Sequence, residues 1–310
     1  MRTRTIGSLE VTVVGIGCNN FGGRIDEAAT RSVVSAALDE GITLFDTADI
    51  YGGERSEELL GRALAGRRDE VVIATKFGMS VGSRTGGAAP QYVRDAAETS
   101  LRRLGTDHID LLQLHTPDLS VPIGDTLAAL AELVAEGKVR EIGCSNFDSS
   151  QLTAADDAAA SGGGGPRFVS VQNEYSVLHR EPEDSVLASC SELGVAFLPY
   201  FPLAKGLLTG KYRRAEPPPA GSRLAGFDDV RRERELSDER LRAVEGLDEL
   251  AAASGRTLLD LAFGWLLARD VVSSVIAGAT TPAQVRANAA TADFVPDDAL
   301  LAGIDVIAPR

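Results

Sequence analysis

The feature that most constrains the fold of this chain is a regular alternation of strand-like and helix-like segments. Eight short apolar runs have the length of buried strands and span residues 15–17, 42–45, 71–76, 109–115, 141–146, 168–173, 195–200 and 272–278. Nearly all are followed by segments with helical spacing, at residues 28–38, 56–64, 90–104, 122–136, 150–160, 182–193 and 282–292. Such alternation is typical of a parallel sheet, and eight units favour a closed (β/α)8 barrel.

Two further segments complete the expected architecture. Residues 2–6 and 9–14 have the pattern of a short hairpin that precedes the first barrel strand. Residues 213–235 contain three consecutive prolines and many charged side chains, so we expect one long irregular loop there. Because a barrel of this type typically needs about 250 residues, we expect a single domain over residues 1–310.

Charge and cysteine content limit the partners and the setting expected of this chain. With 31 basic and 45 acidic residues the net charge is −14, which argues against general binding to nucleic acid or to an anionic membrane. No apolar run approaches the roughly 18 residues needed to span a membrane, and we expect no signal peptide. The three cysteines have no metal-type spacing, so the sequence predicts no metal site and a reduced, cytoplasmic setting.

Ionisable side chains stand at the ends of three successive strand-like runs. These are Asp46, Lys76 and His115, and Tyr51 follows shortly after Asp46. The carboxyl ends of parallel barrel strands meet at one face, where the active sites of such barrels lie. A tyrosine hydroxyl has an ordinary pKa of about 10, and a nearby ammonium would lower that pKa by stabilising the phenolate. We therefore expect a site in which Lys76, held by Asp46, assists Tyr51.

This group of residues suits the donation of a proton to an oxygen that is gaining negative charge. No serine or cysteine nucleophile motif is visible, so the attacking group would have to come from a cofactor. Taken singly, Lys76 could form a salt bridge at the barrel mouth, His115 could lie in the core, and Tyr51 could serve packing alone. His108 and His179 have no comparable context, and we interpret them as structural.

Several longer motifs carry a family resemblance. They are Phe45-Asp46-Thr47-Ala48-Asp49-Ile50-Tyr51-Gly52, Ala74-Thr75-Lys76, Asp110-Leu111-Leu112-Gln113-Leu114-His115, Gly143-Cys144-Ser145-Asn146-Phe147, Val171-Gln172-Asn173-Glu174-Tyr175 and Pro202-Leu203-Ala204-Lys205-Gly206-Leu207-Leu208-Thr209-Gly210-Lys211-Tyr212. In these motifs, over nearly its whole length, the chain resembles the aldo-keto reductases. The resemblance implies that Tyr51 is the general acid that protonates a substrate carbonyl oxygen. It also implies that Lys76, paired with Asp46, lowers the pKa of Tyr51 and that His115 orients the carbonyl group.

The resemblance further implies a nicotinamide cofactor, with hydride delivered from its C4 atom and with the loop 213–235 covering it. Ser145, Asn146 and Gln172 would bind the carboxamide, and Tyr200 would stack on the nicotinamide ring. The other residues that the resemblance assigns to the cofactor are Gly17, Cys18 and Asp46, then Pro202, Leu203, Gly206, Leu207, Lys211 and Arg223 around the pyrophosphate, and Gly278, Thr280, Gln284 and Asn288 at the adenosine end.

The adenosine end departs from one common family pattern, in which a lysine and an arginine bind the 2′-phosphate of NADPH. This chain has Gly278 and Gln284 at those positions. Relatives similar to potassium-channel β subunits also use a Gly-Ala-small-residue run with glutamine and asparagine. We therefore expect NADPH as the cofactor, with Thr280, Gln284 and backbone N–H groups as phosphate ligands, and NADH use stays open.

The substrate pocket also departs from the family pattern, because Cys18 and Asn19 stand where the family often has Thr-Trp. Candidates to replace the missing aromatic wall are Phe21, Phe77, Met79, Thr116 and Pro117. The sequence predicts an NADPH-dependent reductase of aldehydes or ketones, acting on a small-molecule carbonyl substrate, and its oligomeric state stays open. Two alternatives also stay open: a nucleotide-sensing subunit with little turnover, similar to potassium-channel β subunits, and a Schiff-base aldolase that uses Lys76.

Overall fold

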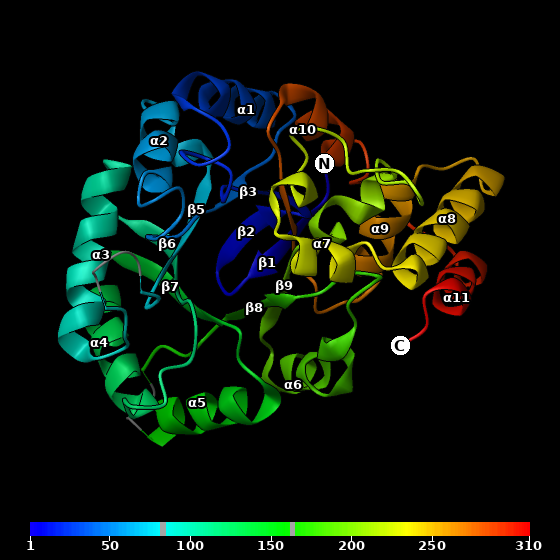
Figure 1. Cartoon of the computed structure of the whole chain (residues 1–310). Coiled ribbons are helices and arrows are strands. Elements are labelled where there is room, and N and C mark those ends of the chain that lie inside the picture. The colour runs from blue at the N-terminus through cyan, green and yellow to red at the C-terminus, as the bar shows by residue number, and fades with distance from the viewer. Residues whose placement is uncertain (81–84, 162–164) are drawn as a thin grey trace.

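The computed structural model describes residues 1–80, 85–161 and 165–310 and shows a barrel of eight parallel strands inside a ring of helices (Figure 1). In order around the barrel the strands are β10 (Val275–Gly278), β3 (Val14–Gly17), β4 (Leu44–Asp46), β5 (Val72–Phe77), β6 (Ile109–Leu114), β7 (Val139–Ser145), β8 (Ser170–Glu174) and β9 (Ala196–Tyr200). The barrel closes beside β9, where the Phe197 N–H donates to the Val271 carbonyl at 2.7 Å and the Ser273 N–H donates to the Phe197 carbonyl at 3.2 Å. The predicted (β/α)8 barrel is confirmed.

A two-stranded hairpin closes the N-terminal end of the barrel, as the sequence predicts. It consists of β1 (Thr3–Ile6) and β2 (Leu9–Thr12), paired antiparallel. The hairpin buries Ile6, Leu9 and Val11 inside the barrel, against Leu44, Val72, Ala74, Leu111, Leu198 and Ile276. With this end filled by apolar side chains, the polar residues of the strands gather at the opposite, C-terminal ends.

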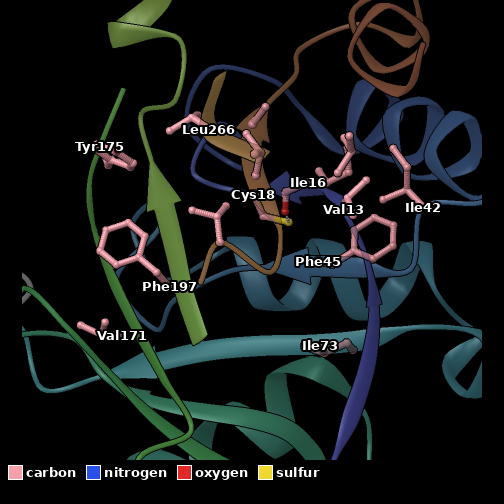
Figure 2. Close-up of a cluster of buried hydrophobic side chains, with 14 of the residues drawn as sticks. Val13, Ile16, Cys18, Ile42, Phe45, Ile73, Val171, Tyr175, Phe197 and Leu266 are labelled. Atoms are coloured by element: carbon pink, nitrogen blue, oxygen red, sulfur yellow. Dashed lines mark hydrogen bonds between the residues drawn. The ribbon is translucent and has the colours of Figure 1, made fainter. Parts of the chain in front are cut away.

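A larger apolar cluster lies between the barrel and the surrounding helices (Figure 2). Successive strand residues point to opposite faces, so Phe45 and Ile73 join this outer cluster while Leu44 and Ala74 face the lumen. Both faces of the strands are therefore buried. This explains why the strands appear in the sequence as continuous apolar runs rather than as alternating ones.

The helices that follow the strands lie close to their predicted places. They are α1 (Glu27–Asp39), α2 (Ser56–Ala63), α3 (Pro90–Leu104), α4 (Ile123–Ala135), α5 (Ser149–Ser161), α6 (Val186–Leu193) and α10 (Pro282–Ala289). The helix α3 shows how the local sequence sets the bounds of a helix. Pro90, which lacks an N–H, suits its first position, and Gly105 ends it in a left-handed conformation with φ of 65°.

The structure corrects the prediction for the last third of the chain. Residues 213–235 are not one irregular loop, because they contain a short 3-10 helix, Leu224–Gly226, and the helix α7 (Asp229–Glu235). The side chain of Asp228 accepts the Arg231 N–H and so caps α7, a signal hidden among the many charges of this segment. Three more helices were not predicted: α8 (Asp238–Ala253), α9 (Leu258–Leu267) and α11 (Asp298–Ile307).

Within the described ranges, no single helix is both long and apolar enough to cross a membrane. The helices α8 and α9 meet that test only as a pair, with a bend of 94° between them.

Candidate active site

The ionisable residues singled out in the sequence come together at the C-terminal ends of the strands. Asp46 is the last residue of β4, Lys76 lies near the end of β5, and His115 directly follows β6. A cavity of about 850 Å³ opens at this end of the barrel, and Asp46, Tyr51 and His115 line it. The structure therefore brings Asp46, Tyr51, Lys76 and His115 together, as expected from the sequence.

Lys76 is the centre of this group. Its ammonium is fully buried and donates to Asp46 Oδ2 at 2.6 Å, to the Thr47 carbonyl at 3.0 Å and to the Tyr51 hydroxyl at 3.4 Å. An ammonium has three donors, so these contacts use all of them. The ring of His115 packs edge-on against the ring of Tyr51, with 5.9 Å between the centroids.

The pKa of Tyr51 departs from the sequence-based expectation. Burial raises the pKa of Tyr51, the nearby charge of Lys76 lowers it, and the charge of Asp46 raises it again. The net direction is upward rather than downward, because burial has the largest effect and Asp46 offsets part of the effect of the Lys76 charge. The phenol is therefore protonated at neutral pH, with an ammonium in place to stabilise the phenolate once the proton leaves.

The two neighbouring bases also carry shifted pKa values. Burial alone would lower the pKa of Lys76, but the charges of Asp46 and Tyr51 together raise it, so the ammonium stays charged. Burial and the charge of Lys76 lower the pKa of His115 to about 3. The imidazole is therefore neutral at neutral pH, and its buried Nδ1 atom has no hydrogen-bond partner in the part of the chain that the structure describes.

The residues assigned to the nicotinamide carboxamide form a connected network on the cavity wall. Ser145 Oγ donates to the Gln172 carbonyl at 2.7 Å, and Asn146 Nδ2 donates to the His115 carbonyl at 2.9 Å. The Tyr200 hydroxyl donates to Asn146 Oδ1 at 2.9 Å. Asn146 has a φ of 61°, a left-handed conformation that asparagine tolerates better than most residues. The network fixes these polar groups before any ligand arrives.

A cationic wall lies along another part of the cavity. Lys211 and Arg223 were assigned to the pyrophosphate, and Arg24, which the sequence analysis missed, lines the cavity with them. Burial and the mutual proximity of these cations lower the pKa values of Lys211 and Arg223. In the part of the chain that the structure describes, none of the three forms an ion pair with a carboxylate. The buried Ser222 Oγ on the same wall has no hydrogen-bond partner among the described residues.

Among the described residues this wall has no paired carboxylate, which fits an anionic ligand such as a pyrophosphate. Arg223 Nη2 donates to Asn19 Oδ1 at 3.2 Å and to Asn20 Oδ1 at 3.1 Å, and Arg24 Nη2 donates to the Gly221 carbonyl at 2.7 Å. These bonds tie the segment 213–235 to the loop after β3 across the cavity.

The predicted adenosine end is lined by neutral residues. Gln284 Oε1 accepts the Thr280 N–H at 2.7 Å and the Thr280 hydroxyl at 3.1 Å, close to the start of α10. A Cβ atom at Gly278 would lie 3.1 Å from Asn20 Nδ2, so a larger residue would crowd this wall. Asn288 also lines the cavity, as expected.

Some assigned residues do not reach the cavity. Cys18 and Leu207 are fully buried in the outer apolar cluster, where Figure 2 shows Cys18. Phe21 and Phe77 are also buried in that cluster and are not among the residues that line the cavity, so they do not form the missing substrate wall. Met79 and Thr116 do line the cavity, whereas Pro117 is not among the lining residues. Gly17, Pro202, Leu203 and Gly206 line it as expected.

Comparison with known proteins agrees with this geometry. A model of the aldo/keto reductase family matches residues 13–308. The chain belongs to the aldo/keto reductase family. The aldo-keto reductase YhdN of Bacillus subtilis (strain 168) is 35% identical over 288 residues, which cover 90% of this chain and 84% of that protein. A probable voltage-gated potassium channel subunit beta of Arabidopsis thaliana is 33% identical over 310 residues, covering 96% and 92% of the two chains.

Solved structures of this family are also similar over nearly the whole length. The holo form of the aldo-keto reductase AKR11C1 from Bacillus halodurans is 32% identical, with a TM-score of 0.81 and coverage of 99% of this chain and 96% of that one. The glycerol dehydrogenase AKR11B4 from Gluconobacter oxydans is 30% identical, with a TM-score of 0.86 and coverage of 98% and 94%. Membership of the aldo/keto reductase family supports an oxidoreductase activity for this chain.

Proposed function

We propose that this aldo-keto reductase reduces aldehydes and ketones to alcohols with NADPH. The observation that carries the proposal is the buried Lys76–Asp46 ion pair at 2.6 Å, whose ammonium lies 3.4 Å from the hydroxyl of Tyr51 on the cavity wall. A protonated phenol beside a fixed cation is suited to protonating an oxygen that gains negative charge.

When bound, the cofactor supplies the hydride for carbonyl carbon reduction. Tyr51 donates its proton to the carbonyl oxygen of the substrate, and Lys76 stabilises the phenolate that remains. The neutral imidazole of His115 orients the carbonyl by hydrogen bonding, without placing a second positive charge beside Lys76. Asp46 keeps the ammonium in place.

Different residues along the cavity would bind different parts of the cofactor. Ser145, Asn146 and Gln172 would hold the carboxamide and Tyr200 the nicotinamide ring. Arg24, Lys211 and Arg223 would bind the pyrophosphate, together with Ser222, Pro202, Leu203 and Gly206, which also line the cavity. The segment 213–235 would cover the cofactor.

NADPH is preferred in this proposal over NADH because of the polar groups at the adenosine end. Gln284 Oε1 is occupied by Thr280, which leaves the Nε2 donors of Gln284 for an anion near the start of α10. These are neutral donors, so we expect a preference of about tenfold in kcat/KM, the equivalent of one good hydrogen bond. Measurement of kcat/KM with both cofactors tests this preference.

A Schiff-base aldolase is disfavoured by the state of Lys76. Its side chain is fully buried, its pKa is raised, and its three donors are occupied by Asp46, the Thr47 carbonyl and Tyr51. An imine requires a neutral amine that the carbonyl carbon can reach. Borohydride trapping in the presence of carbonyl substrates should therefore leave the mass of the protein unchanged.

The decisive experiment for the proposed function follows NADPH absorbance with a panel of aromatic aldehydes and diketones. Carbonyl-dependent consumption with a kcat above about 1 per second would support a working reductase. Tight NADPH binding without turnover on the panel would instead favour a nucleotide-sensing subunit, the role suggested by the similarity to the channel subunit of Arabidopsis thaliana. Absence of binding would contradict both.

A further inference from the structure

Gln113 is a fully buried polar residue that the proposed chemistry does not use. It lies on β6 between Lys76 of β5 and Gly143 of β7, its partners in the strand register. Burial of a carboxamide is unfavourable unless its donors and acceptor find partners. The partners of Gln113 therefore indicate why a polar side chain occupies this place.

Two carboxamides meet on one oxygen of Asp46. Gln113 Nε2 donates to Asp46 Oδ1 at 3.2 Å, and Gln172 Nε2 donates to the same atom at 2.8 Å. The other oxygen, Oδ2, accepts from Lys76 at 2.6 Å. An ionised carboxylate only accepts hydrogen bonds, so each carboxamide must turn its NH₂ group toward Asp46.

Gln113 also fixes the orientation of Gln172 directly. Gln172 Nε2 donates to Gln113 Oε1 at 3.3 Å as well as to Asp46 Oδ1. A flipped Gln172 would bring its oxygen against two acceptors, which is electrostatically unfavourable. Gln172 lines the cavity, and its Oε1 has no protein partner in the described ranges, so this oxygen is the acceptor left for a ligand.

The neighbouring strands leave little freedom for this arrangement. A Cβ atom at Gly143 would lie 3.3 Å from Gln113 Cγ and 2.4 Å from Ser170 Oγ. Gly143 therefore provides the room in which the Gln113 side chain lies. Ser170, the register partner of Gly143, is also fully buried, but its hydroxyl has no hydrogen-bond partner within the described ranges.

We propose that Gln113 is a positioning residue that acts through Asp46 and Gln172. It holds the Gln172 carboxamide with the oxygen available to the cavity, and so selects a ligand that carries an amide N–H donor. This inference rests on the proposed function, in which that ligand is the nicotinamide carboxamide. In this proposal Gln113 touches neither cofactor nor substrate, but it decides which end of the Gln172 carboxamide faces the cofactor.

The test compares two oxidised cofactors in calorimetric binding. One is NADP⁺, and the other is its 3-acetylpyridine analogue, in which a methyl ketone replaces the carboxamide and removes the N–H donor. We expect the wild-type protein to bind NADP⁺ about tenfold more tightly, the value of one buried hydrogen bond. In Gln113→Leu the preference should fall to about threefold, because Gln172 Nε2 then keeps only Asp46 Oδ1 of the two acceptors that fix the orientation of its carboxamide.

A ratio of two affinities is insensitive to the fraction of protein that folds, so a purely structural loss would not change it. Ser170→Ala is the matched control, because it alters a buried neighbour whose hydroxyl makes no hydrogen bond to the described residues, and the tenfold ratio should persist. Should Gln113→Leu fail to fold, Gln113→Met has nearly the same length but lacks the oxygen that accepts from Gln172, and it should show the same reduced preference.

Two outcomes would overturn the inference in distinguishable ways. A folded Gln113 variant that binds both nucleotides and keeps the wild-type ratio would show that Gln113 does not orient Gln172, while leaving the proposed function intact. A wild-type protein that binds neither nucleotide would overturn the proposed function, and the inference would fall with it.

Discussion

Replacement of Lys76 by methionine removes the ammonium that lies 2.6 Å from Asp46, 3.0 Å from the Thr47 carbonyl and 3.4 Å from the Tyr51 hydroxyl. Breaking a buried ion pair typically costs about 3–5 kcal/mol, because it leaves one charge without its partner. Asp46 keeps two carboxamide donors after the substitution, so we expect a loss near the lower limit, about 3 kcal/mol in the free energy of unfolding.

The same contacts give this free energy a pH dependence of defined sign. Although burial alone would lower the pKa of Lys76, Asp46 and Tyr51 raise it above its ordinary value of 10.5. The folded protein therefore holds this proton more tightly than the unfolded chain does. The resulting stabilisation is complete below the ordinary pKa and is lost as the pH rises through the folded pKa. Lys76→Met should lack this alkaline loss.

Activity should fall more sharply than stability. Removal of one fixed group that stabilises developing charge typically lowers kcat by about 100- to 1000-fold. The cofactor Kd should change little, because Lys76 does not line the cavity. The assays are urea denaturation at several pH values and NADPH-dependent turnover. Lys138→Met is the control, since that lysine pairs with Glu98 and Glu136 near the protein surface. A Lys76→Met protein with normal kcat and unchanged stability would refute the reasoning.

Two further substitutions test the cationic wall and the neutral histidine. Arg24→Met should weaken NADPH binding by about tenfold at low salt and by less at high salt, because one charge-assisted contact to the pyrophosphate is lost; Arg31→Met on the exposed face of α1 is the control, and equal affinities in calorimetry would exclude a role for Arg24. Because the pKa of His115 is lowered to about 3 in the folded state, its contribution to stability is present above its ordinary pKa of 6.5 and declines as the pH falls below that value. Between pH values of about 6 and 4, the free energy of unfolding of the wild type should therefore fall more steeply than that of His115→Asn, by about 1.4 kcal/mol per pH unit. Urea denaturation that gives the same pH dependence for both proteins would contradict this.

The barrel could be predicted because its signals are local and repeated. Strands such as Val72–Phe77 are buried along their whole length, and the ends of the helix Pro90–Leu104 are marked by Pro90 and Gly105. The four residues of the site could be predicted because the topology brings the ends of neighbouring strands together. In contrast, α8 and α9 lie within the long connection between β9 and β10, and α11 follows the last strand–helix unit, so the regular spacing of the repeat does not mark them.

Other features depend on contacts between distant parts of the chain. Arg24 is held at the cavity by a hydrogen bond to the Gly221 carbonyl, which is 197 residues away in the sequence. The pKa of Tyr51 depends on how far burial and the Asp46 charge, which raise it, offset the Lys76 charge, which lowers it. The spacing of these residues in the sequence does not give the relative size of these effects. Gln113 stood within a recognised motif, but its role depends on the orientation of Gln172 on another strand.

The measurement that tests the central claim most directly compares Tyr51→Phe with the wild-type protein in NADPH-dependent carbonyl reduction and in NADPH binding. The substitution removes only the hydroxyl that lies 3.4 Å from Lys76. Tyr175→Phe is the control, since it removes a hydroxyl bound to Glu183 outside the cavity. We predict that Tyr51→Phe lowers kcat by at least about 100-fold with NADPH affinity nearly unchanged, as expected for loss of a general acid. Turnover of Tyr51→Phe at the wild-type rate would contradict the account.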